Sequence, residues 1–545
     1  MQQVSPAAAP RRLTGTPARQ HLRSKVATAC IAIYLLLTPL QAYLYENFPW
    51  QLETPPSLET VATWQQAEAF WLRFAHNRYT PETFFDGASY CHDAKTNTDI
   101  YRMVLNLSEP IPQEKCRSNL LTKLNNGAIL SVNLEDRLCA FAASPNATRV
   151  DAFSACQKNV VAGIEQSIIC AWLTPGNDLD KTLTASGLYT YYNIFFMRPS
   201  IPFLYTKLAW RFLLVIYLGY RLYFDYFRHC RDLLRDCALV EGHRCEVFFG
   251  DPTSLVLLDP WITLVMSLDV WLSAAVIGSS TLAAVQMDDT WQFMLGCIYL
   301  SRLVWIAYFA VAIASPILKR LHMERRVSPV DPTFVSLATM LVSGPMTYQQ
   351  GQSAFFTRVY LWLFNAKAPD PHTIEVGYAT TFFLSTIATL PFILGLASCP
   401  RVRSTVMPSG LDLVSIFASL DFNDWKHRML FRYQIMPAAQ TRDVLFYGGN
   451  LHAWFHANPS FRRALGLSQR GLDCYVLVFN VQGRATECIR VSLLRLLDTN
   501  QPNVIMAKTE GDAPFCKVTI EVDNATSALS YVVVEPHHGQ CRWLE

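Results

Sequence analysis

The sequence predicts a polytopic α-helical membrane protein with about six transmembrane helices, an α+β lumenal or extracellular domain and an α+β C-terminal domain. Two apolar limbs, 261–285 and 291–318, follow one another with only a short acidic tip between them. Each limb exceeds the roughly 20 apolar residues that cross a hydrocarbon core of about 30 Å. Hydrophobic residues make up 51% of the chain and charged residues 16%, whereas soluble domains carry about 25% charged residues. A soluble core would not bury both limbs, so the chain belongs in a bilayer.

The N-terminal segment 1–25 is basic, contains no acidic residue and is rich in alanine and proline. This composition predicts a disordered tail, and the positive-inside rule places it in the cytosol. The apolar run 26–45 follows. A cleaved signal peptide has an apolar core of only about 7–15 residues, so we interpret this longer run as a transmembrane signal anchor. An organellar transit peptide is the alternative, because its composition is also rich in arginine and poor in acids.

Residues 46–203 are predicted to form a lumenal or extracellular domain. Asn106 and Asn146 each begin an Asn-x-Ser/Thr sequence, the acceptor pattern for N-glycosylation in the secretory route. Cysteines are also concentrated here, and in an oxidising compartment they would form two disulfides and leave one thiol over. The disulfide candidates are Cys91, Cys116, Cys139, Cys156 and Cys170.

Hydrophobic periodicity assigns secondary structure within this domain. The pattern at 58–75 predicts an amphipathic helix, and that at 160–173 predicts a second one. Short alternating runs at 100–107 and 128–134 predict strands.

The chain then re-enters the membrane. Asp259 and Asp331 each precede a proline, which is the signature of a helix start with aspartate at the N-cap and proline at the first helical position. Both therefore have a structural explanation. The spans of the transmembrane bundle 204–399 are predicted at 204–225, 261–285, 291–318, 333–347 and 376–398.

The fifth span lies in an interrupted region, 333–366. A short apolar run ends at Gly344 and Pro345, a polar stretch follows, and a second apolar piece comes after it. The region is either one short span followed by an interfacial or re-entrant helix, or a broken pair that crosses twice. A single crossing puts both termini and the C-terminal domain, 400–545, in the cytosol, in agreement with the arginines that follow the last span. Two crossings would put this domain outside, where the sequon at Asn524 could be used.

The C-terminal domain carries the weakest chemical signals of the chain. No nucleotide-binding, serine-hydrolase, zinc-protease or Cys-x-x-Cys motif is present, and a net charge of +3 does not indicate a nucleic-acid partner. His452 and His456 are one helical turn apart, but no third metal ligand is identifiable, so we expect no cofactor and no catalytic site. A helix is predicted near 450–465, with strands near 474–481, 516–522 and 530–535.

Of the charged residues within the apolar spans, three are candidates for a functional or pairing role: Asp269, Arg302 and Arg221. A charge at mid-span costs roughly 2.5–3.5 kcal/mol on insertion scales, so it normally faces a partner inside the bundle. On straight helices Asp269 would lie about 6 Å to the cytosolic side of its limb centre and Arg302 about 3 Å to the outer side, and their side chains would lean apart. Arg221 lies on the cytosolic half of its span and leans toward Asp269. We therefore expect an Asp269–Arg221 pair, with a neutral or water-facing Asp269 as the main alternative.

The hairpin and its flanks carry a resemblance to other proteins. The stretches GDPTSLVLLDPWITLVMSLDVWLS, LGCIYLSRLVW and SPVDPTFVSLATMLVSGPMTY, within about 250–350, resemble uncharacterised multi-pass membrane proteins of water moulds (oomycetes). That resemblance implies a membrane location and no particular activity. In layout alone, the chain is similar to the polycystin and mucolipin cation channels, which would place a pore near 349–372. It departs from them in its short fifth span and in lacking an acidic or glycine-rich filter.

These observations favour a receptor-like or scaffolding protein of the plasma membrane or an endomembrane, reached by the secretory route. The outer and C-terminal domains would bind protein partners, and the lipid bilayer would surround the spans. The alternative is a channel or transporter that uses the interrupted region 333–366 and the intramembrane charges. A membrane enzyme is a third hypothesis, with the histidine pair as its only support.

Overall fold

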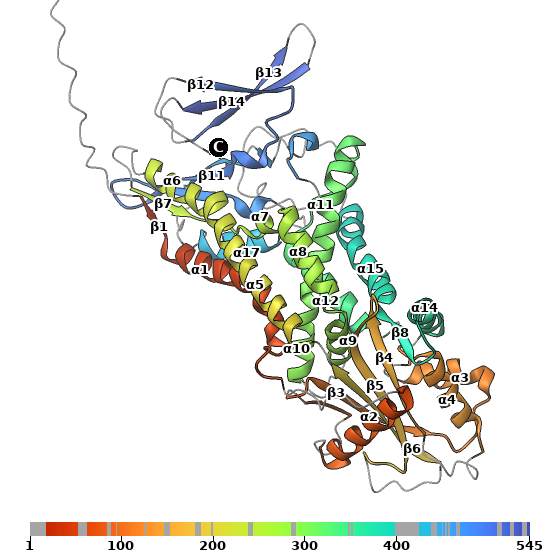
Figure 1. The fold of residues 1–545 in the computed structure, drawn as a ribbon. Coiled ribbons are helices and arrows are strands. Elements are labelled where there is room, and N and C mark those ends of the chain that lie inside the picture. The colour runs from red at the N-terminus through yellow and green to blue at the C-terminus, as the bar shows by residue number, and fades with distance from the viewer. Residues whose placement is uncertain are drawn as a thin grey trace, which may run out of the picture.

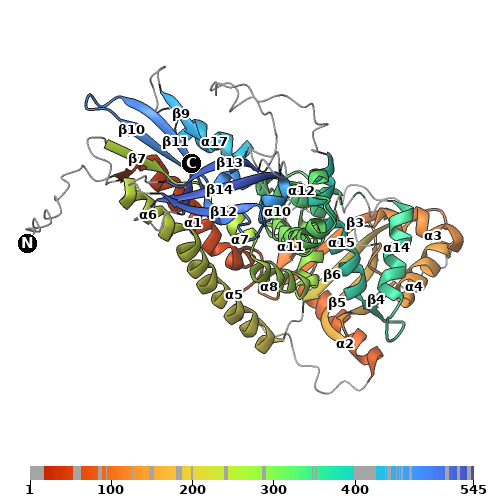
Figure 2. The same ribbon diagram turned by 90° about the horizontal axis from the view of Figure 1, so that it is seen from above.

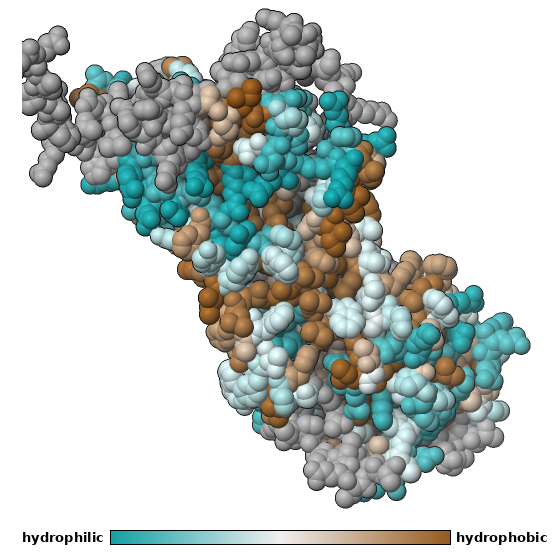
Figure 3. Space-filling view, turned by 45° about the horizontal axis from the view of Figure 1, so that its top comes forward, coloured by the Kyte–Doolittle hydropathy of each residue, from teal (hydrophilic) through white to brown (hydrophobic). Residues whose placement is uncertain are grey.

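The computed structural model consists of two sheet domains joined by a bundle of helices (Figure 1). An apolar band lies between two hydrophilic ends on the face shown in Figure 3. The described residues are 18–52, 63–83, 89–93, 95–124, 127–145, 153–179, 187–197, 200–237, 244–284, 290–346, 349, 353–397, 425–435, 437, 444–449, 451–452, 455, 458–464, 469–509, 515–523, 528–536 and 542–545.

One end is a six-stranded sheet, which we call the disulfide domain because both disulfides lie in it. Neighbouring strands are antiparallel except for β4 and β8, which are parallel. The strands run in the order β2 (Tyr90–Asp93), β3 (Thr98–Asn106), β6 (Leu188–Met197), β5 (Ile164–Pro175), β4 (Ser154–Val161) and β8 (Thr373–Glu375). The helices of this domain are α2 (Trp64–Arg78), α3 (Gln113–Asn119) and α4 (Val132–Ala143).

The two faces of this sheet bury different partners because side chains alternate along each strand. Ile168 and Ile194 pack with Trp71 of α2 on one face. The opposite face packs partly on α3 and α4 and partly on the helical bundle, through Tyr101 and Phe195. The sheet is therefore joined to the bundle by a continuous apolar core.

Two secondary-structure predictions in this domain are wrong. The segment 160–173 is a turn and a strand rather than a helix: Ala162 and Gly163, with φ of 51° and 80°, form the turn between β4 and β5. A strand buried on both faces is a continuous apolar run, which periodicity cannot distinguish from a buried helix. The segment 128–134 is not a strand, because Ser131 accepts a hydrogen bond from the backbone N–H of Leu134 and caps α4. The strand expected at 100–107 and the helix within 58–75 are present as β3 and α2.

Among the described residues, four helices are long and apolar enough to cross a membrane, or five if a bent pair is counted as one span. The bent pair is α8 and α9, which meet at 74°. The bundle contains α1 (Leu22–Leu37) with the 3-10 helix η1 (Thr38–Leu44), α5 (Ile201–Leu222), η5 (Tyr223–Phe227), α6 (Arg228–Cys237), α8 (Pro260–Trp271), α9 (Ala274–Ala283), α10 (Thr290–Leu300), η6 (Ser301–Leu303), α11 (Val304–Arg320), α12 (Pro332–Leu341), the π-helix η8 (Val342–Met346), α14 (Ala354–Asn365) and α15 (Val376–Ala397).

The predicted helix starts at Asp259 and Asp331 are confirmed. Asp259 accepts hydrogen bonds from the backbone N–H groups of Trp261 and Ile262, at 2.9 and 3.1 Å. Asp331 accepts one from Thr333 at 2.8 Å. These carboxylates satisfy donors that a helix N-terminus leaves unpaired.

The limb predicted at 261–285 is broken in the middle. Ser273 lies at the break between α8 and α9, and its hydroxyl donates to the carbonyl of Asp269 at 2.7 Å. Bonds of this kind, from serine to the carbonyl four residues earlier, often bend helices. The second limb is also interrupted, by η6 between α10 and α11.

The interrupted region 333–366 forms α12, η8 and α14. Gly344 and Pro345 lie in the π-helix, and a Cβ on Gly344 would come within 3.3 Å of the Ala284 side chain. Helix α14 then packs against α15 and against the disulfide domain, and the next strand, β8, pairs with β4 of that domain. The segment from α14 to β8 therefore lies at the disulfide-domain end.

The other end is the C-terminal domain, whose main sheet joins three distant parts of the chain. Figure 2 shows β7, β10 and β11 together, at the end away from β3–β6. The main sheet contains β1 (Arg19–Gln20), β7 (Arg244–Phe248), β10 (Cys474–Phe479), β11 (Ala485–Leu493) and β15 (Trp543–Leu544), with β9 (Leu445–Gly448) beside β11. A smaller sheet contains β12 (Val504–Thr509), β14 (Ala528–Pro536) and β13 (Lys517–Asp523), and α17 spans Trp425–Gln434.

The predicted C-terminal strands are present as β10, β13 and β14. The helix predicted at 450–465 is wrong in its second half: 458–464 contain a short 3-10 helix, Pro459–Phe461, and Arg462 forms a β-bridge with Leu497. Six residues of the predicted helix lie outside the described residues.

Candidate functional site

Five ionic side chains form a buried cluster inside the bundle, which we call the charge cluster. Each is between 0 and 7% exposed. Glu46 follows the first helix, two cations lie on α5, one carboxylate lies on α8 and one cation lies on η6. The members are Glu46, Lys207, Arg211, Asp269 and Arg302.

Arg211 is the centre of the charge cluster because it contacts both carboxylates. Its Nη1 donates to Glu46 Oε2 at 2.7 Å, and its Nε donates to Asp269 Oδ1 at 3.1 Å. Arg302 also donates to Asp269. Lys207 Nζ lies 2.8 Å from Ser273 Oγ and 3.4 Å from Glu46 Oε2. The cluster thus ties the first helix, α5, α8 and η6 together.

The formal charge of the cluster does not cancel. Three positive charges come from Lys207, Arg211 and Arg302. Two negative charges come from Glu46 and Asp269, so the sum is +1. In a low-dielectric interior each carboxylate is needed to offset the desolvation of its cationic neighbours. A further negative charge next to the cluster would be favourable.

The expected Asp269–Arg221 pair is wrong. Arg221 Nε lies 3.0 Å from Asp225 and 2.8 Å from Asp259. Asp259 precedes Asp269 by ten residues, or about 15 Å along a helix. On straight helices Asp269 and Arg302 would lie at different depths, whereas α8 and α9 meet at 74° beside Ser273 and Arg302 donates to Asp269.

Two cations and one carboxylate of the cluster are not among the site residues that the sequence predicts. Lys207 and Arg211 are four residues apart within the predicted span 204–225, so they share one helix face. Two cations on one face of an apolar span indicate a buried anionic partner. Glu46, immediately after the first apolar run, was the available anion.

A second polar network joins the disulfide domain to α9. Asp99 is fully buried and lies 2.8 Å from His92 Nδ1. Tyr90 donates to Asp99 at 2.7 Å, and Ser279 of α9 also donates to it. The Tyr45 hydroxyl is 2.8 Å from that of Ser279. We call this network the junction.

Histidine and aspartate at the junction form an ion pair. Burial lowers the pKa of His92, but the Asp99 carboxylate and, more weakly, Asp93 outweigh it and raise the pKa. Burial raises the pKa of Asp99, but the His92 charge and the hydrogen bonds from His92, Ser279 and Tyr90 outweigh it and lower the pKa.

We expect the junction to be strongest in mildly acidic solution. A raised histidine pKa stabilises the fold below about pH 6.5 and is lost as the pH rises through the folded-state value. A lowered aspartate pKa stabilises it above about pH 3.9 and is lost as the pH falls through the folded-state value. Thermal unfolding of the wild type and of His92→Gln, measured from pH 5 to pH 9, should show a stability difference that shrinks at alkaline pH. A pH-independent difference would contradict the ion pair.

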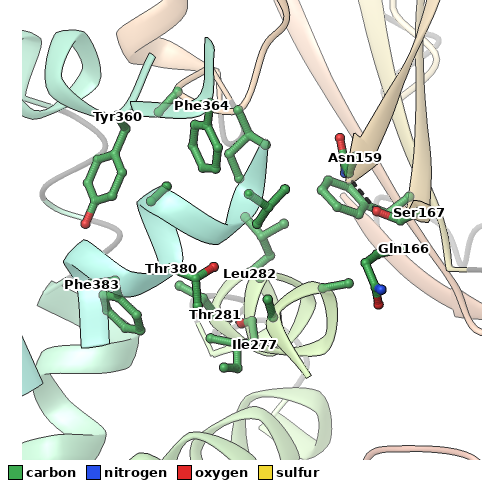
Figure 4. A pocket seen from close by; sticks show the side chains of 18 of the residues that line it. Asn159, Gln166, Ser167, Ile277, Thr281, Leu282, Tyr360, Phe364, Thr380 and Phe383 are labelled. Atoms are coloured by element: carbon green, nitrogen blue, oxygen red, sulfur yellow. Dashed lines mark hydrogen bonds between the residues drawn. The ribbon is translucent and has the colours of Figure 1, made fainter. Parts of the chain in front are cut away.

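An apolar cavity lies between the disulfide domain and the helices α9, α14 and α15 (Figure 4). Its volume is about 160 Å³. Phe383 and Thr380 of α15, Tyr360 and Phe364 of α14, and Ile277 of α9 form one side. On the strand side, the Asn159 amide donates to Ser167 Oγ at 2.8 Å, so these two polar groups satisfy each other.

The cavity walls are uncharged. Burial raises the pKa of Tyr360 to about 12, so its phenol stays neutral. An engineered cavity of about 150 Å³ with apolar walls stays dry and binds benzene. A volume of about 160 Å³ with apolar walls therefore suits an apolar group of similar size.

A smaller polar pocket of about 30 Å³ adjoins the cavity, because Gln166 and Ala275 line both. Glu46, Lys207 and Ser273 also line it, so it lies between the charge cluster and the cavity.

The cysteines of the disulfide domain pair as Cys116–Cys139 and Cys156–Cys170. Cys91 is a free thiol. This outcome agrees with the prediction of two disulfides and one remaining thiol. The candidate glycan acceptor Asn106 is exposed at the end of β3, whereas Asn146 and Asn524 lie outside the described residues.

The C-terminal domain contains a Ser-His-Asp contact that is not a catalytic triad. His452 Nε2 lies 2.9 Å from Asp473 and 3.4 Å from the Ser492 hydroxyl. A triad needs the acid and the serine on opposite ring nitrogens. Burial lowers the pKa of His452, and Arg490 donates to Asp473 at 2.6 Å, so the contact is a neutral histidine in a structural network.

The expected histidine pair is not assembled within the described residues, since His456 lies outside them. In the part of the chain that the structure describes, no three His, Cys, Asp or Glu side chains lie close enough together to hold a metal ion.

Comparisons of the chain with protein-family models, with curated proteins and with solved structures find no match.

Proposed function

We propose that the protein is a receptor-like membrane protein in which a change in the disulfide domain is relayed to the C-terminal domain. The observation that carries this proposal is one continuous helical rod, made of α5, the π-helix η5 and α6, which runs from Ile201 to Cys237. At 1.5 Å per residue its length is about 55 Å, more than the roughly 40–45 Å of a whole bilayer.

One end of the rod follows the disulfide domain closely in sequence, and the other end packs in the C-terminal domain. Ile201 follows the central strand β6 by four residues, since that strand ends at Met197. At the other end, Tyr226 and Cys230 are buried in the core of the C-terminal domain, and the Trp543 indole donates to the carbonyl of His229 at 3.0 Å. We propose that a displacement of β6 is passed along the rod to the C-terminal core.

The contacts within the charge cluster support a structural role for the intramembrane charges. Both carboxylates contact cations of the same cluster, so neither faces an open path. Helix α14, in the segment where a channel layout would place a pore, packs between α15 and the disulfide domain. These contacts favour the receptor-like function over a channel.

The proposed topology is six crossings with both termini in the cytosol. The strands β1, β7 and β10 share one sheet, which requires the N-terminal tail, the loop after α6 and the C-terminal domain to lie on one side. The described cysteines of that sheet, Cys245, Cys474 and Cys488, are free thiols, as a reducing compartment favours. The short run α12–η8 is the fifth crossing, and the bent pair α8–α9 is the third.

The topology predicts glycosylation at Asn106 and Asn146 and none at Asn524. Each asparagine should be changed to glutamine in turn, and the electrophoretic mobility compared with and without glycosidase. The mobility shift caused by glycosidase should become smaller in Asn106→Gln and in Asn146→Gln, because each loses one glycan. It should be unchanged in Asn524→Gln. A glycan on Asn524 would place the C-terminal domain outside and would overturn the proposed topology.

Hydrogen exchange tests the relay. Asp99→Asn weakens the junction, and amides of β10 and β11 should then exchange faster in the full chain in lipid nanodiscs. Glu82→Gln, on the short 3-10 helix η2 (Pro81–Thr83) of the same domain, is the matched control and should leave them unchanged. Leu213→Gly with Ile216→Gly weakens the rod at exposed positions by about 1 kcal/mol each and should abolish the transmitted effect. Exchange that changes only in the disulfide domain would contradict the relay.

An anion carrier is the second candidate, favoured by the helix breaks at Ser273 and η6 beside the charge cluster. Interrupted helices near buried charges are typical of transporter sites, and the surplus positive charge selects an anion. Uptake of a labelled small carboxylate by reconstituted vesicles, lost in Lys207→Gln, would support the carrier over the receptor.

A further inference from the structure

We propose that the apolar cavity and the adjoining polar pocket form one site for a single-chain amphiphile with a carboxylate head, such as a free fatty acid. The inference names the ligand class of the proposed receptor and rests on that function. The cavity would take the end of the apolar chain, and the pocket would take the head.

The position of the two spaces relative to each other defines the orientation of the ligand. Gln166 and Ala275 line both of them. Ala274 and Ile277, on the first turn of α9, face the cavity, while Ser273 and Val276 face the pocket. A ligand that occupies both spaces must be apolar at one end and polar at the other.

The charge of the cluster beside the pocket favours an anion. Lys207 and Glu46 line the pocket, and they belong to a cluster with three cations and two carboxylates. Lysine has three donors, of which two are directed to Glu46 and Ser273. The ammonium also lies 5.7 Å from the centroid of the Phe203 ring, a contact that a ligand carboxylate would replace. A third carboxylate would bring the formal charge of the cluster to zero.

The N-terminus of α9 adds to this selection. The helix spans ten residues, and its first turn lines the pocket. The positive end of its dipole favours a negative group at that position. Lys207 and the helix N-terminus therefore act on the same volume.

The size of the pocket favours a carboxylate over a phosphate. Its volume of about 30 Å³ is roughly two to three times the 10–15 Å³ that one water requires by this measure. Two carboxylate oxygens fit this space, whereas a phosphate with four oxygens exceeds it.

Gly278 provides a variant that blocks the cavity without disturbing the fold. It lies on α9 and lines the cavity, and a Cβ built on it meets nothing within 4 Å. Gly278→Leu would place a side chain in the empty space. Replacing a helical glycine also improves helix propensity, so the thermal stability should be maintained or raised.

The test is equilibrium binding of radiolabelled dodecanoate to the full chain in nanodiscs, with empty nanodiscs subtracted. Wild-type protein should bind, and dodecanol and acetate should compete at least tenfold more weakly than unlabelled dodecanoate. Gly278→Leu and Lys207→Gln should each weaken binding at least tenfold. Lys319→Gln, which changes a lysine paired with Asp498 in the C-terminal domain, is the matched control and should bind normally.

Unchanged binding in a folded Gly278→Leu would overturn the assignment of the cavity. Equal competition by dodecanol would overturn the carboxylate head, and tighter binding of dodecyl phosphate would replace it with a phosphate. Absence of saturable binding in the wild type would overturn the whole inference. The relay is measured by hydrogen exchange without ligand, so its failure and the failure of binding are separate results.

Discussion

Replacing Asp269 with asparagine should cause a large loss of folded protein. The change removes one of the two carboxylates that offset three buried cations, and the formal charge of the cluster rises from +1 to +2. Breaking a buried ion pair by removing one partner costs about 3–5 kcal/mol, because the remaining charge is left uncompensated. Size-exclusion chromatography in mild detergent would report the folded yield, and thermal unfolding would report the stability.

The matched control is Lys207→Gln, which leaves two cations and two carboxylates. Its folded yield should stay close to that of the wild type, even though it also alters the charge cluster. A loss as large as that of Asp269→Asn would mean that the charge balance does not govern stability here.

Double variants identify the partner of Asp269. Arg302 contacts it directly, so adding Arg302→Gln to Asp269→Asn should cost less than the sum of the two single changes, as expected for residues in contact. Arg221 pairs with Asp225 and Asp259. Combining Arg221→Gln with Asp269→Asn should therefore cost the sum of the two single changes. Non-additivity with Arg221 and additivity with Arg302 would contradict the observed arrangement.

Removing the disulfide between Cys156 and Cys170 should also destabilise the protein strongly. The two cysteines face each other across β4 and β5 and are separated by 14 residues. A bond that closes a loop of this size stabilises by about 3 kcal/mol, and the bond packs in the core between the sheet and α2. Cys156→Ala with Cys170→Ala should lower the thermal midpoint of the disulfide domain.

Cys91→Ala is the matched control, because this cysteine is a free thiol in the same domain. It should leave the thermal midpoint nearly unchanged and reduce the number of thiols labelled under denaturing, non-reducing conditions by one. The double variant should leave that number unchanged. The reverse labelling result would show that Cys91 takes part in a disulfide.

The periodicity and charge of the sequence were sufficient for features that depend on local chemistry. A long apolar run must be buried or placed in lipid whatever its neighbours are, so the long helices α5, α11 and α15 were predicted correctly. The pairs Asp259–Pro260 and Asp331–Pro332 determine helix starts through bonds within one turn. Concentration of cysteines in 46–203 indicated an oxidised domain, which agrees with the two disulfides.

Tertiary structure decided the features that depend on where helices break and what they meet. Periodicity did not reveal that the limb 261–285 bends at Ser273. It also did not reveal that the segment 160–173 forms a turn and a strand, because an apolar run has the same pattern in a buried strand and in a buried helix. On straight helices, Asp269 and Arg302 lie at different depths, so the sequence did not predict their contact. It also did not identify Glu46 and Arg211 as partners. The charge cluster, the junction and the apolar cavity each combine residues far apart in the chain. The sequence determined which segments are apolar and which residues are charged, whereas the packing of bent helices against a sheet determined which charges meet and where a cavity remains.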